Sequence, residues 1–195
     1  MKSNICKIEK DEKTLDRIFK ECEKVAVYNE LGPKQSLQLR LLCEELVNML
    51  PSILSNFSGE FWIENSENSY EIYLSVNVEN MDVATRERLI KVSKNNKNSS
   101  VVGITGKIRA VFDYMAMGSN APAMTPAGRY GFSSTTDFSQ IWSLRLYRES
   151  LEQEVVRKPE VWDEFERSII VNVADDVIVG VKGNNVNIII KKNFA

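Results

Sequence analysis

Two polar residues four positions apart, Glu44 and Asn48, offer the clearest chemistry in this sequence. They lie in the segment 36–54, SLQLRLLCEELVNMLPSIL, whose spacing predicts an amphipathic helix. Residues four apart are neighbours on one side of a helix, so a carboxylate and an amide oxygen would lie together there. Such a pair suits a magnesium-held phosphate or an activated water molecule. The alternative is that both are solvated surface residues.

The same helix carries an apolar stripe that should face a core. Its members recur at three- and four-residue steps, which puts them on one side of the helix: Leu39, Leu42, Leu46, Met49, Leu50 and Ile53. Leu37 and Leu41 share the opposite side with Glu44 and Asn48, so we expect that side to be covered as well. Pro51 is expected to kink or end the helix.

The overall composition is that of an ordinary globular protein, and it argues against several function classes. The chain has 195 residues, 43% hydrophobic and 27% charged, which suits a single domain over 1–195. A net charge of −2 and the lack of a basic stripe argue against nucleic-acid binding. The N-terminus lacks the apolar core of a signal peptide, and no apolar run is long enough to span a bilayer. We therefore expect a cytoplasmic protein that has no membrane partner.

Histidine is absent, and this absence removes more mechanisms than any motif adds. A Ser-His-Asp triad, a Cys-His pair and a phospho-accepting histidine are all excluded. The three cysteines, Cys6, Cys22 and Cys43, are odd in number and far apart in sequence, without CxxC spacing. They predict buried thiols rather than a disulfide framework or a zinc site.

The periodicities elsewhere predict an α+β fold. Strict alternation over 70–79, with Tyr70 and Ile72 on one side and Glu71 and Tyr73 on the other, predicts a strand with one buried and one wet face. A two-layer α/β sandwich follows, with a mixed, mostly antiparallel sheet and helices on one face. The other expected elements are an edge strand at 5–8, helices at 14–28, at 83–93 and from 104, a strand at 61–64, a turn at 65–69 and a closing hairpin over 177–190.

Three later segments are less regular. Residues 118–136 are rich in Gly, Pro, Ser and Thr and have no periodicity, and a loop of this length is typical of a lid or a binding loop. We therefore expect a lid there. Alternation around Arg145 favours a strand at 138–146, with a helix as the open alternative. Apolar spacing from Trp162 to Val173 predicts a helix that begins at Glu160.

The order of these elements, with EELVN at 44–48 on one helix and GITGK at 103–107 before another, resembles the GHKL superfamily of ATP-binding domains. The chain is most similar to the small anti-sigma-factor serine kinases, and beyond them to histidine-kinase ATPase domains and gyrase-type enzymes. EELVN matches the Asn-box of the superfamily. GITGK falls where its second glycine-bearing phosphate loop would lie.

This resemblance implies ATP and magnesium as ligands, and an ATPase or a serine/threonine kinase as the activity. It assigns Asn48 to the metal and Glu44 to the catalytic base that activates or positions water. It also puts the second loop near the phosphates, with the residues Gly103, Thr105, Gly106 and Lys107. Free backbone N–H groups at a helix start bind anions, which agrees with this loop assignment. A simple turn and helix cap is the alternative for GITGK, whose spacing is too short for a Walker loop.

One motif of the superfamily is missing. Its members read adenine with an Asp in a D-x-G-x-G segment, whereas the corresponding residues here, SVNVENMD at 75–82, contain no glycine. Asp82, Glu79 or Asn77 could take the place of that Asp, and we assign the contact with adenine to Asp82.

Two functions of different classes therefore remain. The first is an ATP-binding regulatory protein of histidine-kinase or anti-sigma-factor type. The second is a non-catalytic interaction module on the same fold, with ATP binding lost, whose helix face and loop 118–136 bind a protein partner. Both leave open whether the chain forms a homodimer.

Overall fold

The computed structural model describes residues 1–11, 13–54, 57–77, 108, 132–133, 140–154, 168–182 and 184–194. Its elements in chain order are β1 (Cys6–Glu9), α1 (Lys13–Tyr28), α2 (Pro33–Asn48), α3 (Leu50–Ile53), β2 (Ser58–Ser66), β3 (Ser69–Asn77), β4 (Phe132–Ser133), β5 (Gln140–Ser143), α6 (Leu144–Glu154), α8 (Ile169–Val173), β6 (Asp176–Lys182) and β7 (Asn185–Asn193).

The strands form one seven-stranded sheet in the order β1-β2-β3-β7-β6-β5-β4. All six pairs of neighbouring strands are antiparallel. The predicted edge strand is β1, at one end of the sheet, and the closing hairpin is β6–β7. Because β7 pairs with β3 as well as with β6, the last strand of the chain lies in the middle of the sheet. The protein therefore has the α+β fold that the sequence predicts.

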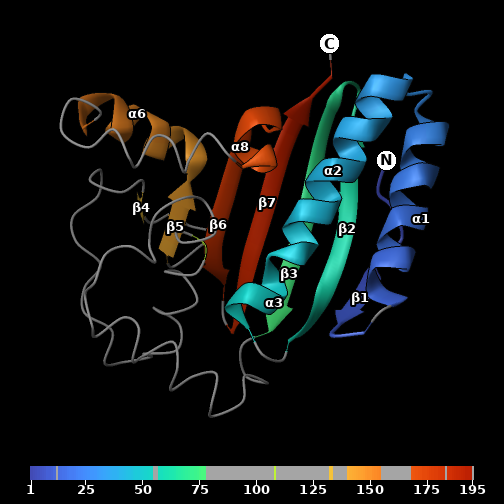
Figure 1. Cartoon of the computed structure of the whole chain (residues 1–195), viewed down its shortest axis with the longest axis horizontal. Coiled ribbons are helices and arrows are strands. Elements are labelled where there is room, and N and C mark those ends of the chain that lie inside the picture. Colours follow the sequence, from blue (N-terminus) through green and yellow to red (C-terminus); the bar gives the residue numbers. More distant parts are fainter. Residues whose placement is uncertain are drawn as a thin grey trace.

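Helices cover one face of this sheet. Figure 1 shows α1, α2, α3 and α8 in front of the strands. On the covered face the strand side chains are buried, among them Phe61, Ile72 and Ile188. Tyr147 of α6 contacts Trp142, which is buried on the same side, with 5.9 Å between ring centroids. The opposite face carries the alternating residues, such as Trp62, Tyr73 and Ile189, which remain partly exposed. We call it the open face.

The apolar stripe of α2 forms the centre of the core, as predicted. Its residues are between 0% and 6% exposed: Leu39, Leu42, Leu46 and Met49, followed by Leu50 and Ile53 of α3. The opposite side of α2 differs from the expectation, because Leu37 is 56% exposed. The cover expected over that side is therefore missing at Leu37.

Two other predictions are wrong in detail. Residues 138–146 form neither one strand nor one helix, because β5 ends at Ser143 and α6 begins at Leu144. The Asp176 carboxylate accepts hydrogen bonds from the Arg145 N–H (3.0 Å) and the Ser143 hydroxyl (3.2 Å), so a residue 31 positions away from Arg145 caps the new helix. The helix expected from Glu160 is not continuous either, since Ser168 is extended and α8 covers only Ile169–Val173.

Several expected elements lie outside the described residues. These are the helix at 83–93, all but Ile108 of the helix from 104, and most of the loop 118–136. Within that loop, Phe132–Ser133 form β4, so the expectation of an irregular loop is wrong at these two positions. Ile108 is helical and fully buried, which agrees with its predicted place on an apolar helix face.

Candidate functional site

The candidate site lies at the C-terminal end of α2. This helix begins where it does because Pro33 occupies its first turn and the Gln35 side chain accepts a hydrogen bond from the Gly32 N–H at 3.0 Å. It ends at Asn48 because Pro51, which has no N–H, cannot donate the next helical hydrogen bond to the carbonyl of Val47. The sequence thus places Asn48 in the last turn of α2.

Glu44 and Asn48 lie on the side of α2 that faces away from the core. Glu44 is partly buried and Asn48 is exposed. Among the residues described by the structure, neither side chain has a hydrogen-bond or ion-pair partner. Polar groups without protein partners remain available to a ligand, in contrast to the paired carboxylates elsewhere on the surface.

Asn48 lines a hollow of about 230 Å³ between the end of α2 and the turn that joins β1 to α1. The hollow is lined by Glu9, Lys10, Asp11, Thr14, Leu15, Val47, Asn48, Pro51 and Phe57. The amide of Asn48 carries an oxygen atom of the kind that magnesium prefers, and the Asp11 carboxylate carries two more, which already contact Thr14 and Arg17. Glu44 lies one turn earlier on α2 and is not one of the lining residues.

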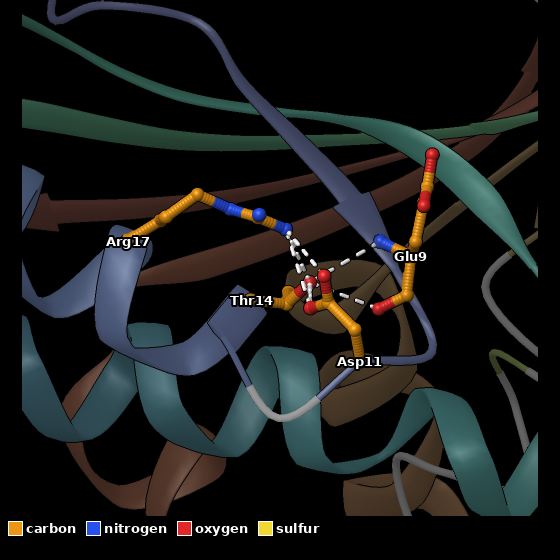
Figure 2. Close-up of polar contacts among 4 residues, drawn as sticks. All are labelled: Glu9, Asp11, Thr14 and Arg17. Atoms are coloured by element: carbon orange, nitrogen blue, oxygen red, sulfur yellow. Dashed lines mark hydrogen bonds and ion pairs between the residues drawn. The ribbon is translucent and has the colours of Figure 1, made fainter.

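The β1–α1 turn is held by the buried hydroxyl of Thr14 (Figure 2). This hydroxyl oxygen lies 2.9 Å from the Glu9 carbonyl, 2.5 Å from Asp11 Oδ1 and 2.8 Å from an Arg17 guanidinium nitrogen. The hydrogen bond with Thr14, helped by the positive charge of Arg17, lowers the pKa of the Asp11 carboxyl. Figure 2 shows the Glu9 carboxylate pointing away from this network, so Glu9 takes part through its backbone alone.

A second hollow, of about 340 Å³, lies on the open face at the same end of the sheet. It is lined by Lys7, Ile8, Glu9, Ser58, Gly59, Glu60, Ser75, Asn77 and Asn185. Glu9 borders both hollows, and Asn77 is the last residue of β3. The end of β3 and the end of α2 therefore meet at one end of the sandwich, the lower end in Figure 1. Asp82 follows Asn77 by five residues, a reach of at most about 17 Å.

The other residues that the sequence assigns to the site lie outside the described residues. These are Asp82, Gly103, Thr105, Gly106 and Lys107. Their assignments to the adenine and to the phosphates therefore stay predictions. In the described part of the chain, no group of three or more Cys, Asp or Glu side chains is placed to hold a metal ion. A magnesium ion at Asn48 would need phosphate and water oxygens to complete its ligand set.

Glu45 is a polar residue of α2 whose contacts the sequence did not predict. Its Oε1 accepts a hydrogen bond from the Ser168 hydroxyl at 2.8 Å, while its Oε2 is buried without a partner. The helical position of Glu45 is 100° from that of Glu44, which turns it toward α8 instead of the outward side. No local pattern signals this contact, because Ser168 lies 123 residues further along the chain.

Two further groups of polar residues have structural roles. Asp176 caps α6, and Asp175 accepts a hydrogen bond from the Asn193 N–H at 2.6 Å and pairs with Lys192, so both acids have partners within the fold. The cysteines are all buried, as predicted. Burial, and then a hydrogen bond with the Cys22 thiol, raise the pKa of the Cys43 thiol.

Comparison with known proteins adds no functional information. None of the described helices is long and apolar enough to cross a membrane. No family model, no curated protein and no solved structure matches this chain. The function therefore has to be inferred from the chain's own residues and their geometry.

Proposed function

We propose that this chain is an ATP-binding regulatory protein of the GHKL type, which holds the metal–phosphate end of the nucleotide at the end of α2. The observation that carries the proposal is the free Asn48 side chain, which lines a hollow together with the oxygen-bearing residues Glu9 and Asp11. The α+β sandwich and the position of EELVN on a helix that packs on the sheet agree with it.

The size of the hollow limits what it can hold. At about 230 Å³ it is smaller than the pockets of roughly 300–1,000 Å³ that enclose drug-sized ligands. Leu15, Val47, Pro51 and Phe57 make its lining mainly apolar, so a hydrated magnesium ion and its phosphates would bind at the edge that Asn48 and Asp11 form. The base and ribose would bind beyond it, and the resemblance assigns the adenine to Asp82.

In this proposal Asn48 binds magnesium through its side-chain oxygen. The bound ion would neutralise phosphate charge. Glu44 lies four residues earlier on the same side of α2, where its unpaired carboxylate can accept a proton from a water molecule or a serine hydroxyl. The activity would then be ATP hydrolysis or phosphoryl transfer to a serine or threonine of a regulatory protein partner.

A thermal-shift experiment with magnesium and ATP tests the proposal. Ligand at a hundredfold excess over its dissociation constant stabilises the folded protein by about 2.7 kcal/mol. For a chain of this length that corresponds to a rise in Tm of about 5–11 °C. Asn48→Ala should remove this rise with little change in the Tm of the free protein. Asn172→Ala, which changes another exposed helical asparagine, should keep it.

Glu44→Gln separates binding from chemistry. This variant should bind magnesium–ATP as the parent does and lose most phosphate release or transfer, because the amide cannot accept the proton. An unchanged magnesium–ATP shift in Asn48→Ala would reject the assignment of the metal site.

A second candidate function is a non-catalytic interaction module that has lost ATP binding. The observation in its favour is the lack of glycine in 75–82, where the superfamily needs glycines to accommodate the purine. Under this alternative no nucleotide, with or without magnesium, changes the Tm of the parent protein.

A further inference from the structure

We propose that two copies of this chain associate face to face through the open face of the sheet. The basis is a band of apolar side chains at one level of the strand register. Trp62 pairs with Tyr73, Tyr73 with Ile189, and Ile189 with Ile178, so the four residues form a row across β2, β3, β7 and β6. All four are partly exposed. Ile5, 52% exposed, precedes β1 at the same level, because Cys6 pairs with Phe61.

The apolar band, made of Ile5, Trp62, Tyr73, Ile189 and Ile178, has the anatomy of an interface core. Trp62 and Tyr73 are stacked, with ring centroids 4.9 Å apart and planes 4° apart. Large aromatic side chains are enriched among the residues that dominate binding energy. The rows on either side are polar, as an interface rim is. One row holds Glu64, Glu71, Lys191 and Asp176, and the other holds Glu60, Ser75 and Asn187 and ends at Gly180.

The charges next to the band favour a second copy as the occupant. A two-fold axis that runs along the strands between β3 and β7 exchanges these two strands. It therefore puts Tyr73 opposite Ile189 of the second copy, and Glu71 opposite Lys191 of the second copy. Glu71 and Lys191 already form an ion pair of 2.9 Å within one chain, so two copies would build a network of alternating charges.

The same axis puts Glu64 opposite Asp176 of the second copy. The Glu64 carboxylate is paired with a lysine of its own chain, whereas the Asp176 carboxylate keeps its negative charge and accepts hydrogen bonds. Lys2 pairs with Glu64 at 3.0 Å, and Asp176 accepts hydrogen bonds from the backbone N–H groups of Arg145 and Val177. Because Lys2 offsets the charge of Glu64, only the Asp176 carboxylate brings a net charge to this contact.

The open face is large enough for a stable dimer. Five strands about 4.8 Å apart and up to nine residues long, at about 3.4 Å per residue, span roughly 24 Å by 30 Å, or on the order of 700 Å² before side-chain relief is counted. Standard interfaces bury about 800 Å² on each partner. Described helices cover only the other face, so such a dimer leaves the end of α2 accessible, and the proposal is independent of nucleotide binding.

Sedimentation velocity of the full chain at about 1–100 µM tests the proposal. The parent protein should sediment as a dimer, with twice the mass of one 22.2 kDa chain. Ile189→Lys places a charge in the apolar band and should raise the dimer dissociation constant at least tenfold. Val27→Lys makes the same kind of change on α1, where Val27 is 78% exposed, and should leave the dimer intact. Far-UV circular dichroism checks that each variant is folded.

A charge-exchange pair tests the symmetry. Glu71→Lys and Lys191→Glu should each weaken self-association, since each brings like charges together across the axis. An equimolar mixture of the two variants should dimerise, because each lysine then meets a glutamate of the other variant. If Ile189→Lys does not fold, Ser75→Arg, next to the band, replaces it. The proposal would be overturned if the parent protein is a monomer or if the dimer survives in a folded Ile189→Lys or Ser75→Arg variant. It would also be overturned if Val27→Lys dissociates the dimer or if the mixture of the two charge variants stays monomeric.

Discussion

The orientation of α2 around its own axis can be tested with two identical substitutions. Leu46 and Leu37 lie on the same helix, nine residues apart, and the structure turns them in opposite directions. Leu46 is 0% exposed and packs in the core, whereas Leu37 is 56% exposed. Leu46→Ala and Leu37→Ala therefore remove the same atoms from a buried and from an exposed site.

The expected loss of stability follows from this burial. Removing three carbon atoms from a fully buried site forfeits about 2.4 kcal/mol of transfer free energy at about 0.8 kcal/mol for each CH₂. The cavity left behind adds to this, so Leu→Ala in a core lowers the free energy of unfolding by about 2–5 kcal/mol. For Leu46→Ala we expect about 3 kcal/mol, which lowers Tm by about 6–12 °C in a chain of this length. Leu37→Ala should stay within about 0.5 kcal/mol of the parent.

Urea denaturation followed by far-UV circular dichroism measures both values. The midpoint should fall for Leu46→Ala while the slope m stays constant, since a core cavity leaves the surface exposed on unfolding nearly unchanged. A nearly neutral Leu46→Ala, or an equal loss for Leu37→Ala, would refute the orientation of α2. The placement of Glu44 and Asn48 on its outward side would fall with it.

Three further predictions concern strand packing, the β1–α1 turn and acid stability. Gly59→Ala should lower the free energy of unfolding by about 1–3 kcal/mol or more, because a Cβ there would lie 2.2 Å from a backbone oxygen of the neighbouring strand. Gly32→Ala should change the free energy of unfolding by less than about 0.5 kcal/mol, because its Cβ would meet only the Gln35 side chain, at 3.6 Å, and its φ is ordinary; equal melting of both variants would contradict this packing. Thr14→Val removes a buried hydroxyl and should lower the free energy of unfolding by about 1–3 kcal/mol. It should also raise the pKa of Asp11 measured by NMR, and an unchanged pKa would show that this hydroxyl is not the main cause of the lowered value. Burial raises the pKa of Glu71, but hydrogen bonds with Lys191 and Tyr73 outweigh it and lower the pKa below the ordinary 4.5. The contribution of Glu71 to stability is therefore present above pH 4.5 and lost as the pH falls below that value. Glu71→Gln lacks this contribution, so between pH 5 and pH 3 it should lose less stability than the parent protein does. An equal loss in both proteins would contradict the lowered pKa.

Much of the fold could be predicted because its patterns are local. The stripe of Leu39, Leu42 and Leu46 predicts which side of α2 is buried, and the alternation over 70–79 predicts which side of β3 faces the core. The change from β5 to α6 has one local signal, Ser143, whose hydroxyl accepts a long hydrogen bond of 3.5 Å from the Leu146 N–H. The second cap, Asp176, could not be predicted, because it lies beyond α8 in the chain.

The candidate site divides in the same way. The helical spacing of Glu44 and Asn48, and Pro51 three residues after Asn48, determine that both residues lie on one side of a helix and near its end. The neighbours of Asn48 in the hollow, Glu9 and Asp11, come from a turn nearly forty residues earlier, and only the packing of α1 against α2 brings them there.

The sequence by itself thus determined the faces of the helices and strands, the absence of histidine chemistry and the end of α2. These depend on the residues of one segment and on the fixed periods of helix and strand. The tertiary structure alone decided which faces meet. Three contacts depend on strand register and helix packing between distant segments: that of Cys22 with Cys43, the hydrogen bond of Ser168 to Glu45, and the row from Trp62 to Ile178. No local period encodes such pairings.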